Sequence, residues 1–258
     1  MTNSTISKLD FFNWHKTLSH FKLLTFETID STNTYAKKYI DETSDITPTI
    51  ITSTQQTAGY GKQSRAFFSP KGLYTTLILP VKHLKNLNPG LVTIATGLGA
   101  VDTLKRYFPH QFFELKWVND VLTNGKKCGG ILVELVQKDS QFFLVIGIGL
   151  NIQTPSFPYE LAQIATSVTT NTCDLTHFLA DLVHHILNRI THQLDNQLIL
   201  DYKNYSSLLN QFITVKGRKQ SYTGIVRDFN TKGGLVLQDP KNLDLTTFYS
   251  GDVTKLIK

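Results

Sequence analysis

Leu-Lys-Trp-Val-Asn-Asp at residues 115–120, followed by Gly-Gly-Ile-Leu-Val-Glu at 129–134, sets the frame for the rest of the sequence. From Phe113 to Val118 alternate side chains are apolar, the period-two pattern of a strand with one apolar face. The same alternation sends Lys116 to the other face, just before the chain turns. A cation at a strand end is a natural anchor for a carboxylate or a phosphate, although most lysines only face solvent. Lys116 is therefore a candidate ligand-binding residue whose role depends on what surrounds it.

Composition predicts a folded protein of ordinary polarity. The chain has 258 residues, enough for one large domain or a large and a small one, with 41% apolar and 18% charged residues. This balance argues against disorder. The net charge is +6 and is spread over the chain, which is compatible with an anionic ligand and equally with simple solubility.

Cysteine usage and hydropathy bear on the compartment. Cys128 and Cys173 form no C-x-x-C pair, which argues against a zinc or dithiol site and favours a reducing compartment. Residues 1–20 have no signal-peptide core, and the longest apolar run, 142–150, is too short for a bilayer. We expect a cytoplasmic protein with no membrane partner.

The N-terminal third alternates strands with one helix. Apolar residues at helical spacing predict a short docking helix within an extension at 1–22, which is too little chain for a helix-turn-helix DNA-binding module. Strands are predicted at 23–29, 49–55 and 72–79, and a helix at 34–40. Ser31 and Thr32 at its start fit N-caps and fit ligand hydroxyls equally well.

The polar segment 56–65 carries two glycines and two cations, as a ligand-covering loop or a mobile surface turn would. It is not a P-loop, because Gln63 follows Gly-Lys where Ser or Thr is required. The Gly-x-Gly-x-Asn sequence at 147–151 is not a Rossmann fingerprint, because the third glycine and the βαβ unit are missing.

The middle of the chain shows clear start and turn signals. Asn88-Pro89 predicts a helix that runs to about Tyr107, in which Gly97 and Gly99 suggest close packing on a sheet. Asn124-Gly125 predicts a type I′ hairpin turn, and 130–137 with 141–149 predict a further hairpin. An irregular connection at 155–172 then leads to a long helix capped by Asp174.

The C-terminal segment changes character. Five short alternating runs at 212–216, 221–229, 235–238, 245–249 and 253–257 are separated by turn residues. They predict a small five-stranded SH3-like barrel at 211–258, following a main domain at 23–210.

Taken together, the sequence resembles the biotin–protein ligases. The resemblance covers all but about the first twenty residues and rests on motifs in family order and at family spacing: Asp-Ser-Thr-Asn at 30–33, Gln-Thr-Ala-Gly-x-Gly at 56–61, Phe-Ser-Pro at 68–70, Lys-Trp-x-Asn-Asp at 116–120, Gly-Ile-Leu-Val-Glu at 130–134 and Gly-x-Gly-x-Asn at 147–151. It implies an α+β fold, with a mixed sheet backed by helices as in class II aminoacyl-tRNA synthetases and a small C-terminal barrel. It also implies the single-function type, without an N-terminal DNA-binding domain.

The resemblance implies a two-step reaction. Biotin and ATP with Mg²⁺ would give biotinyl-5′-AMP, which would then acylate a lysine of the biotin carboxyl carrier protein of acetyl-CoA carboxylase. Asp120 is the candidate position for Mg²⁺, although no metal motif is present. Carried over by position, biotin contacts fall to Ser31, Thr32, Asn33, Gln56, Gly59, Tyr60, Gly61, Lys62, Lys116, Gly130, Gly147 and Gly149; ATP or adenylate contacts to Lys62, Arg65, Phe67, Lys116, Asn119 and Asn151; and catalytic roles to Lys116 and Arg65.

The chemistry agrees with such a residue set. A carboxylate that attacks a phosphate brings two anions together, so preplaced cations lower the barrier and no nucleophilic side chain is needed. The chain departs from the family at Tyr60, Lys62 and Ser64, where arginine, arginine and glycine are usual. Since an ammonium lacks the bidentate fork and a phenol lacks charge, we expect fewer strong bonds between this loop and the adenylate.

Three other functions are compatible with parts of the sequence. A lipoate-type ligase would use similar adenylation chemistry, but its arginine-glycine motif is not visible. A biotin sensor with weak catalysis is suggested by Tyr60 alone. A nucleic-acid-binding protein would need a basic stripe interleaved with aromatic residues. The sequence leaves open whether the protein is a monomer or a homodimer.

Overall fold

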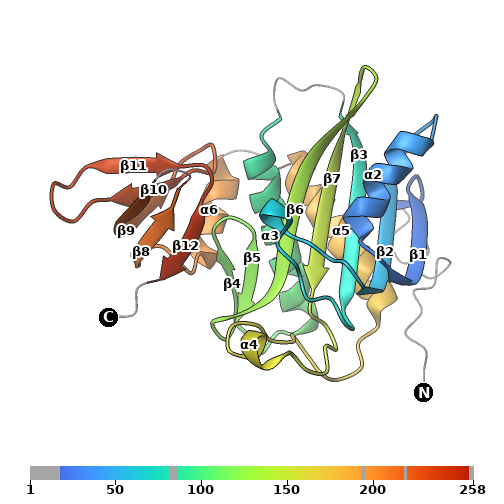
Figure 1. Ribbon diagram of the computed structural model, residues 1–258, viewed down its shortest axis with the longest axis horizontal. Helices are drawn as coiled ribbons and strands as arrows, with labels where there is room; N and C mark the ends of the chain where they lie inside the picture. The colour runs from blue at the N-terminus through green and yellow to red at the C-terminus, as the bar shows by residue number, and fades with distance from the viewer. Residues whose placement is uncertain (1–17, 82–86, 193–195, 218–219, 256–258) are drawn as a thin grey trace.

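The computed structural model describes residues 18–81, 87–192, 196–217 and 220–255. Its centre is a seven-stranded sheet with the order β1-β2-β3-β7-β6-β5-β4 (Figure 1). The strands are β1 (Lys22–Ile29), β2 (Thr49–Gln56), β3 (Leu73–Val81), β4 (Phe113–Lys116), β5 (Asp120–Thr123), β6 (Lys126–Lys138) and β7 (Gln141–Leu150). β1 and β2 are parallel and the other neighbouring pairs are antiparallel, so the predicted mixed sheet is confirmed.

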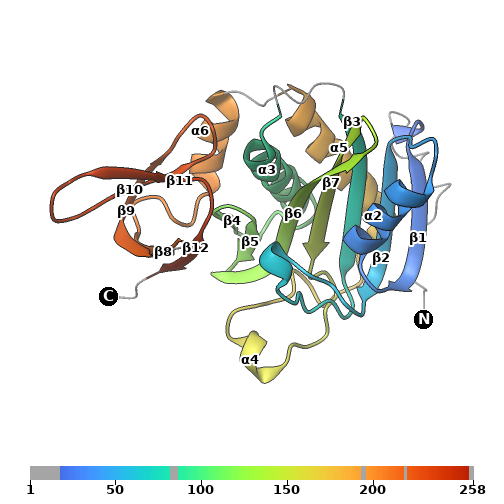
Figure 2. The same ribbon diagram turned by 45° about the horizontal axis from the view of Figure 1, so that its top comes forward.

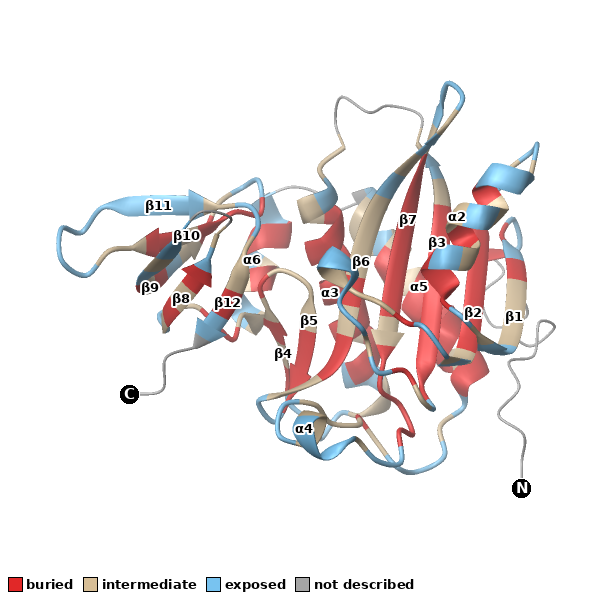
Figure 3. Cartoon of the chain, viewed as in Figure 1, coloured by how far each residue is buried: buried red, intermediate tan, exposed pale blue. Residues whose placement is uncertain are grey.

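Helices cover both faces of the sheet. α3 (Pro89–Tyr107) and α5 (Leu175–His192) lie on one face, and α2 (Thr32–Glu42) lies on the other (Figure 2). Alternation along β2 serves both layers, because Ile50 joins the core under α3 and Ile51 joins the core under α2. β7, the central strand of the sheet, is buried over most of its length (Figure 3).

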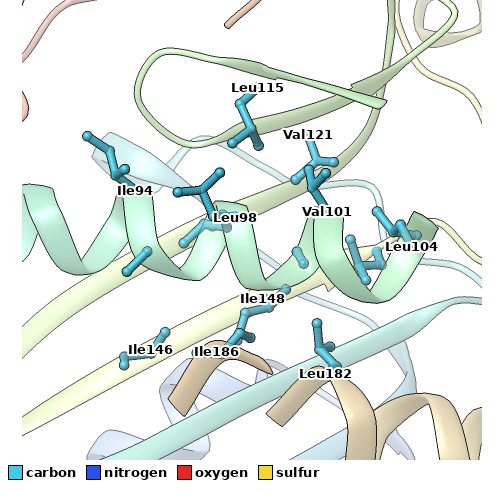
Figure 4. Packing of buried hydrophobic residues seen from close by; sticks show 14 of the residues in the cluster. Ile94, Leu98, Val101, Leu104, Leu115, Val121, Ile146, Ile148, Leu182 and Ile186 are labelled. Atoms are coloured by element: carbon cyan, nitrogen blue, oxygen red, sulfur yellow. The ribbon is translucent and has the colours of Figure 1, made fainter. Parts of the chain in front are cut away.

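The main core is a continuous contact between α3, the sheet and α5. Leu98 and Val101 of α3 lie between Leu115 and Val121 of the sheet and Ile186 of α5 (Figure 4). Gly97 faces the sheet as predicted, since a Cβ there would lie 3.2 Å from Leu115. The prediction for Gly99 was wrong, because a Cβ there would lie 2.8 Å from the Ile186 backbone. This glycine lets α5, rather than the sheet, approach α3.

A second sheet follows in the C-terminal part. It has five strands in the order β11-β10-β9-β8-β12: β8 (Phe212–Lys216), β9 (Ser221–Phe229), β10 (Leu235–Gln238), β11 (Leu245–Phe248) and β12 (Asp252–Lys255). Each strand falls on one of the five predicted runs, so the small C-terminal β domain is confirmed. The Trp117 indole donates to the Gly233 carbonyl at 3.0 Å, which links the end of β4 to this domain.

Local signals placed the starts of α3 and α5 and one hairpin turn correctly. The Asn88 side chain accepts from the amides of Gly90 and Leu91, and Asp174 caps α5 in the same way. Asn124 and Gly125 both have positive φ, as the predicted turn requires.

Two helices were not predicted: α4 (Tyr159–Ala162), within the connection expected to be irregular, and α6 (Asn196–Tyr205). Most of the predicted N-terminal helix lies outside the described residues. None of the described helices is long and apolar enough to cross a membrane.

Candidate functional site

A cavity of about 270 Å³ opens on the α2 side of the sheet, near its meeting point with the C-terminal domain. Its walls come from the start of α2, the end of β2 with the β2–β3 loop, the start of β3, the turn from β4 into β5, the first half of β6, the end of β7 and the start of β12. The β2–β3 loop, with a short 3-10 turn at Lys62–Ser64, passes in front of β6 and β7 (Figure 1). Chain segments more than 200 residues apart therefore meet at one site.

Asn33 forms a polar wall of the cavity at the start of α2. It is only 5% exposed, and both ends of its amide are bonded. Oδ1 accepts from Thr76 Oγ1 at 2.6 Å, and Nδ2 donates to Glu134 Oε2 at 3.0 Å. A Cβ on Gly147 would lie 2.2 Å from Asn33 Oδ1, so the glycine is what gives Asn33 its place.

A second polar wall is held by Gln56. Its Oε1 accepts from the backbone amide of Thr32 at 2.8 Å and from the Thr32 hydroxyl at 3.1 Å. Ser31 caps α2, and its Oγ accepts from the Thr34 amide at 3.4 Å. The cap and the cavity wall are therefore the same residues, and the two interpretations of this segment are compatible.

The cations of the loop reach the C-terminal domain. Lys62 Nζ donates to the Gly251 carbonyl at 3.3 Å, and Arg65 forms an ion pair with Asp252. Hydrogen bonding to Arg65 lowers the pKa of Asp252, and the same bond raises the pKa of Arg65. The first residues of β12 are thereby part of the cavity wall.

Lys116 lies at the end of β4, half-buried in the cavity wall. Within the described residues its ammonium has no hydrogen-bond or ion-pair partner. Its neighbour Asp120 is different, because Asp120 Oδ1 lies 2.6 Å from the ammonium of Lys127. That ammonium also lies 5.4 Å from the centre of the Phe67 ring, a cation–π distance. The cavity thus contains one unpaired cation beside a neutralised pair.

Comparisons with known proteins place part of the chain in a protein family. Residues 25–151 match the model of the biotin/lipoate A/B protein ligase family. The chain contains a domain of this family. The matched segment begins within β1, ends at the residue after β7 and covers the seven-stranded sheet except for residues 22–24 of β1.

The ligase-family domain has relatives in several bacteria. The chain as a whole is 28% identical over 218 residues to the bifunctional ligase/repressor BirA of Bacillus subtilis, covering 80% of this chain and 65% of that protein. Identity to the BirA of Bacillus spizizenii is 35% over 144 residues, covering 54% of this chain and 43% of that protein. Identity to the biotin–[acetyl-CoA-carboxylase] ligase of Mycobacterium tuberculosis is 29% over 203 residues, covering 75% of this chain and 74% of that protein. This chain thus spans less than two thirds of the length of the two Bacillus relatives.

The fold is shared with solved structures. The biotin protein ligase of Aquifex aeolicus in complex with biotin and ATP has a TM-score of 0.74 at 24% identity, covering 90% of this chain and 97% of that chain. The same enzyme without ligand has a TM-score of 0.73. The likeness includes the C-terminal domain as well as the ligase-family domain, because it covers nearly the whole of both chains.

Most of the predicted site residues meet at the cavity of the ligase-family domain. Gly59 and Asn151 do not line it. Gly59 is buried behind Gln56, where a Cβ would lie 2.7 Å from Gln56 Nε2. The Asn151 amide donates to the Thr166 carbonyl at 3.3 Å and holds the segment that follows β7. Asn119 lines the cavity and fixes the turn after β4 by donating to the Ile131 carbonyl.

Several residues at or near the cavity were not predicted as site residues. Lys127 and Tyr74 line it, and Asp252 reaches it from the C-terminal domain. The Tyr74 hydroxyl is buried and has no hydrogen-bond partner among the described residues. Glu134, the last residue of the Gly-Ile-Leu-Val-Glu motif, stands behind the wall as the partner of Asn33. Lys127 could have been found from the sequence, because it stands only three residues before Gly130, which was already a predicted site residue.

Proposed function

We propose that this protein joins biotin to ATP, forming biotinyl-5′-AMP, and transfers the biotinyl group to a lysine of the biotin carboxyl carrier protein of acetyl-CoA carboxylase. The observation that carries the proposal is the unpaired ammonium of Lys116 beside a glycine-walled cavity. A buried or half-buried charge without a partner is costly, so this position suits a residue whose partner is the ligand.

The charge of the cavity supports an anionic ligand. Its lining contains four cationic side chains, Lys62, Arg65, Lys116 and Lys127, and two anionic ones, Asp120 and Asp252. This excess of positive charge complements a carboxylate and a polyphosphate held together. In the first step a carboxylate oxygen of biotin attacks the α-phosphorus of ATP, and the bond to pyrophosphate breaks. Lys116 is placed to stabilise the charge that develops on the phosphoryl oxygens.

In the second step a lysine amine of the carrier attacks the acyl carbon of the adenylate, forms an amide and releases AMP. The chain supplies position and water exclusion for this step rather than a nucleophile. The loop that passes in front of β6 and β7 is suited to exclude water, because an acyl phosphate hydrolyses readily (Figure 1).

Mg²⁺ would enter this reaction with ATP. Among the described residues no group of three or more His, Cys, Asp and Glu side chains is arranged to hold a metal ion. Asp120, the predicted position for Mg²⁺, is paired with Lys127 at 2.6 Å. What the chain itself supplies to these steps is its cationic side chains.

The thiols support a reducing location for this activity. Cys128 is buried and Cys173 half-buried, and neither is in a disulfide. We infer that the protein acts in the cytoplasm, where thiols stay reduced.

The test is ATP–pyrophosphate exchange with biotin, followed by mass measurement of an added carrier domain. We expect biotin-dependent exchange and a mass gain on one carrier lysine. Exchange with lipoate in place of biotin would point to a lipoate-type ligase. Tight biotin binding without exchange would point to a sensor. Either result would overturn the proposal.

A further inference from the structure

The β2–β3 loop has an anchor on β6 that the sequence did not suggest. The hydroxyl of Tyr60, which stands where relatives of this family usually have arginine, donates to Glu134 Oε2 at 3.1 Å. Lys37 of α2 donates to the other oxygen of the same carboxylate at 3.0 Å. Its ammonium also lies 5.1 Å from the centre of the Tyr60 ring. A loop residue, a helix residue and a strand residue therefore form one compact cluster.

Glu134 also reaches the cavity wall through Asn33. Its Oε2 accepts from both the Tyr60 hydroxyl and the Asn33 amide, the latter at 3.0 Å. A carboxylate has about four acceptor sites, so these donors and Lys37 can be accommodated together. Glu134 lies two positions beyond Leu132 on β6, hence on the same face as this cavity-lining residue. The carboxylate thus touches both the loop over the cavity and the residue that forms its polar wall.

The remainder of the loop is held by backbone bonds to residues 29–30, by bonds within the loop, by Phe67 against Lys127 and by the C-terminal domain. The Gly61 amide donates to the Arg65 carbonyl at 2.8 Å, and the Phe67 amide donates to the Gly59 carbonyl at 2.8 Å. Lys62 and Arg65 contact the first residues of β12. Tyr60 therefore supplies a side-chain hydrogen bond from the loop to β6, in addition to the contact of Phe67 with Lys127.

We propose that Glu134 is a positioning residue that couples the loop at 57–66 to Asn33, with Tyr60 as the anchor of the loop and Lys37 as the counter-charge. When the loop lies on the cavity, Glu134 fixes the Asn33 amide in one orientation. When Tyr60 leaves, Glu134 loses one of the contacts that hold it against Asn33. The same carboxylate thereby links the position of the loop to the orientation of the Asn33 amide. The consequence for catalysis, retention of the adenylate, rests on the proposed function.

The plain alternative is that Lys37 and Glu134 form an ordinary surface ion pair. Their side chains are 40% and 28% exposed, and such pairs contribute little by themselves. The two interpretations differ at Tyr60. A surface pair is indifferent to the Tyr60 hydroxyl, whereas the coupling depends on it.

Hydrogen–deuterium exchange of the ligand-free protein tests the coupling without any activity. The variants are Tyr60→Phe, which removes only the hydroxyl, Glu134→Gln, which cannot accept from all three donors, and the two combined. A hydrogen bond to a charged group typically changes an equilibrium by tenfold or more, so we expect amide exchange at 57–66 to rise roughly tenfold in each single variant. The double variant should exchange within about twofold of Glu134→Gln, because both changes remove the same contact.

Lys37→Met should also raise loop exchange, whereas Lys38→Met is the matched control. Lys38 is the next residue on α2 and forms an exposed pair with Glu42 at 3.8 Å, away from the loop. Loop exchange in Tyr60→Phe equal to that of the unchanged protein would overturn the proposal. So would increases that multiply in the double variant, because they would mean that Tyr60 and Glu134 act independently.

Ligand measurements separate this inference from the proposed function. Glu134→Gln should weaken biotin binding through Asn33, and Tyr60→Phe should speed release of preloaded biotinyl-AMP more than it alters the KM for biotin. If the unchanged protein shows no biotin-dependent exchange of pyrophosphate while Tyr60→Phe still opens the loop, the proposed function fails and the coupling stands. If catalysis is present and the loop is unaffected, the coupling fails alone.

Discussion

Replacing Gly147 with alanine should remove Asn33 from the cavity wall. An added Cβ would lie 2.2 Å from Asn33 Oδ1, 2.8 Å from its Cγ and 2.9 Å from its Nδ2. The whole amide would have to move by roughly an ångström to reach ordinary van der Waals contact. Such a shift costs free energy, because Asn33 is buried and its amide is bonded to Thr76 at 2.6 Å and to Glu134 at 3.0 Å.

The magnitude follows from these two bonds. A neutral hydrogen bond contributes about 1 kcal/mol net and one to a charged group about 1.5–3 kcal/mol, so Gly147→Ala should lower the free energy of unfolding by roughly 2–4 kcal/mol. Urea unfolding with an unchanged slope measures this loss. Gly61→Ala is the matched control for stability. Gly61 has extended backbone, and a Cβ there would meet nothing within 4 Å. Its cost should be within about 0.5 kcal/mol.

A double-mutant cycle identifies the cause. In an Asn33→Ala background the clash no longer exists, so adding Gly147→Ala should cost less than about 1 kcal/mol. Biotin binding, measured by calorimetry, should fall in Gly147→Ala and in Asn33→Ala to a similar degree. An equal cost of Gly147→Ala in both backgrounds would refute the reasoning, because the loss would then come from somewhere other than Asn33.

Three further predictions concern other parts of the molecule. Lys116→Ala should leave the urea midpoint unchanged, because its ammonium has no described partner, and should slow biotin-dependent pyrophosphate exchange about ten- to a hundredfold; an unchanged rate would make it a surface lysine. Trp117→Phe should lower the free energy of unfolding by about 1–3 kcal/mol, since it leaves the Gly233 carbonyl without the 3.0 Å bond that links the two domains; an unchanged midpoint would contradict this. Burial raises the pKa of Cys128 to about 12 and that of Cys173 to about 11, so iodoacetamide at pH 8 should label both far more slowly in the native protein than in urea; rapid native labelling of Cys128, seen by mass spectrometry, would show that this strand opens.

Elements with a local signal were predictable from the sequence. Alternation placed the strands, Asn88 before Pro89 placed the start of α3, and Asn124-Gly125 placed the turn between β5 and β6. In each case the deciding interaction lies within a few residues. α6 lacked such a signal, because its buried Leu198 and Ile199 are followed directly by the exposed Leu200. Three adjacent apolar residues fit a strand as well as a helix.

The candidate site was predictable only for those residues that belong to a family motif and also line the cavity. Lys37 and Glu134 are 97 residues apart in sequence, and no spacing rule joins them. Asp252 lies 187 residues from Arg65 and enters the site only because the C-terminal domain folds against the loop. Gly59 and Asn151 were taken from motifs, and both lie behind the wall rather than on it. Motifs therefore identify a neighbourhood, while the tertiary contacts determine which members face the ligand.

The departures from the family in the loop have different physical consequences. Tyr60 brings no charge, but its hydroxyl and its ring face Glu134 and Lys37, so the loop gains a neutral anchor and the charge stays on α2. Lys62 donates to the Gly251 carbonyl, and an ammonium has three donors, so this contact leaves two for a phosphate. Arg65 is already paired with Asp252, and any phosphate at its guanidinium must share it with that carboxylate. An anionic ligand that enters this cavity therefore meets Lys116 without a described partner, Lys62 bonded to a carbonyl and Arg65 paired with a carboxylate. Lys116 is accordingly the cation that the first ligand charge should meet, and the loop cations follow at the cost of rearranging their contacts with the C-terminal domain.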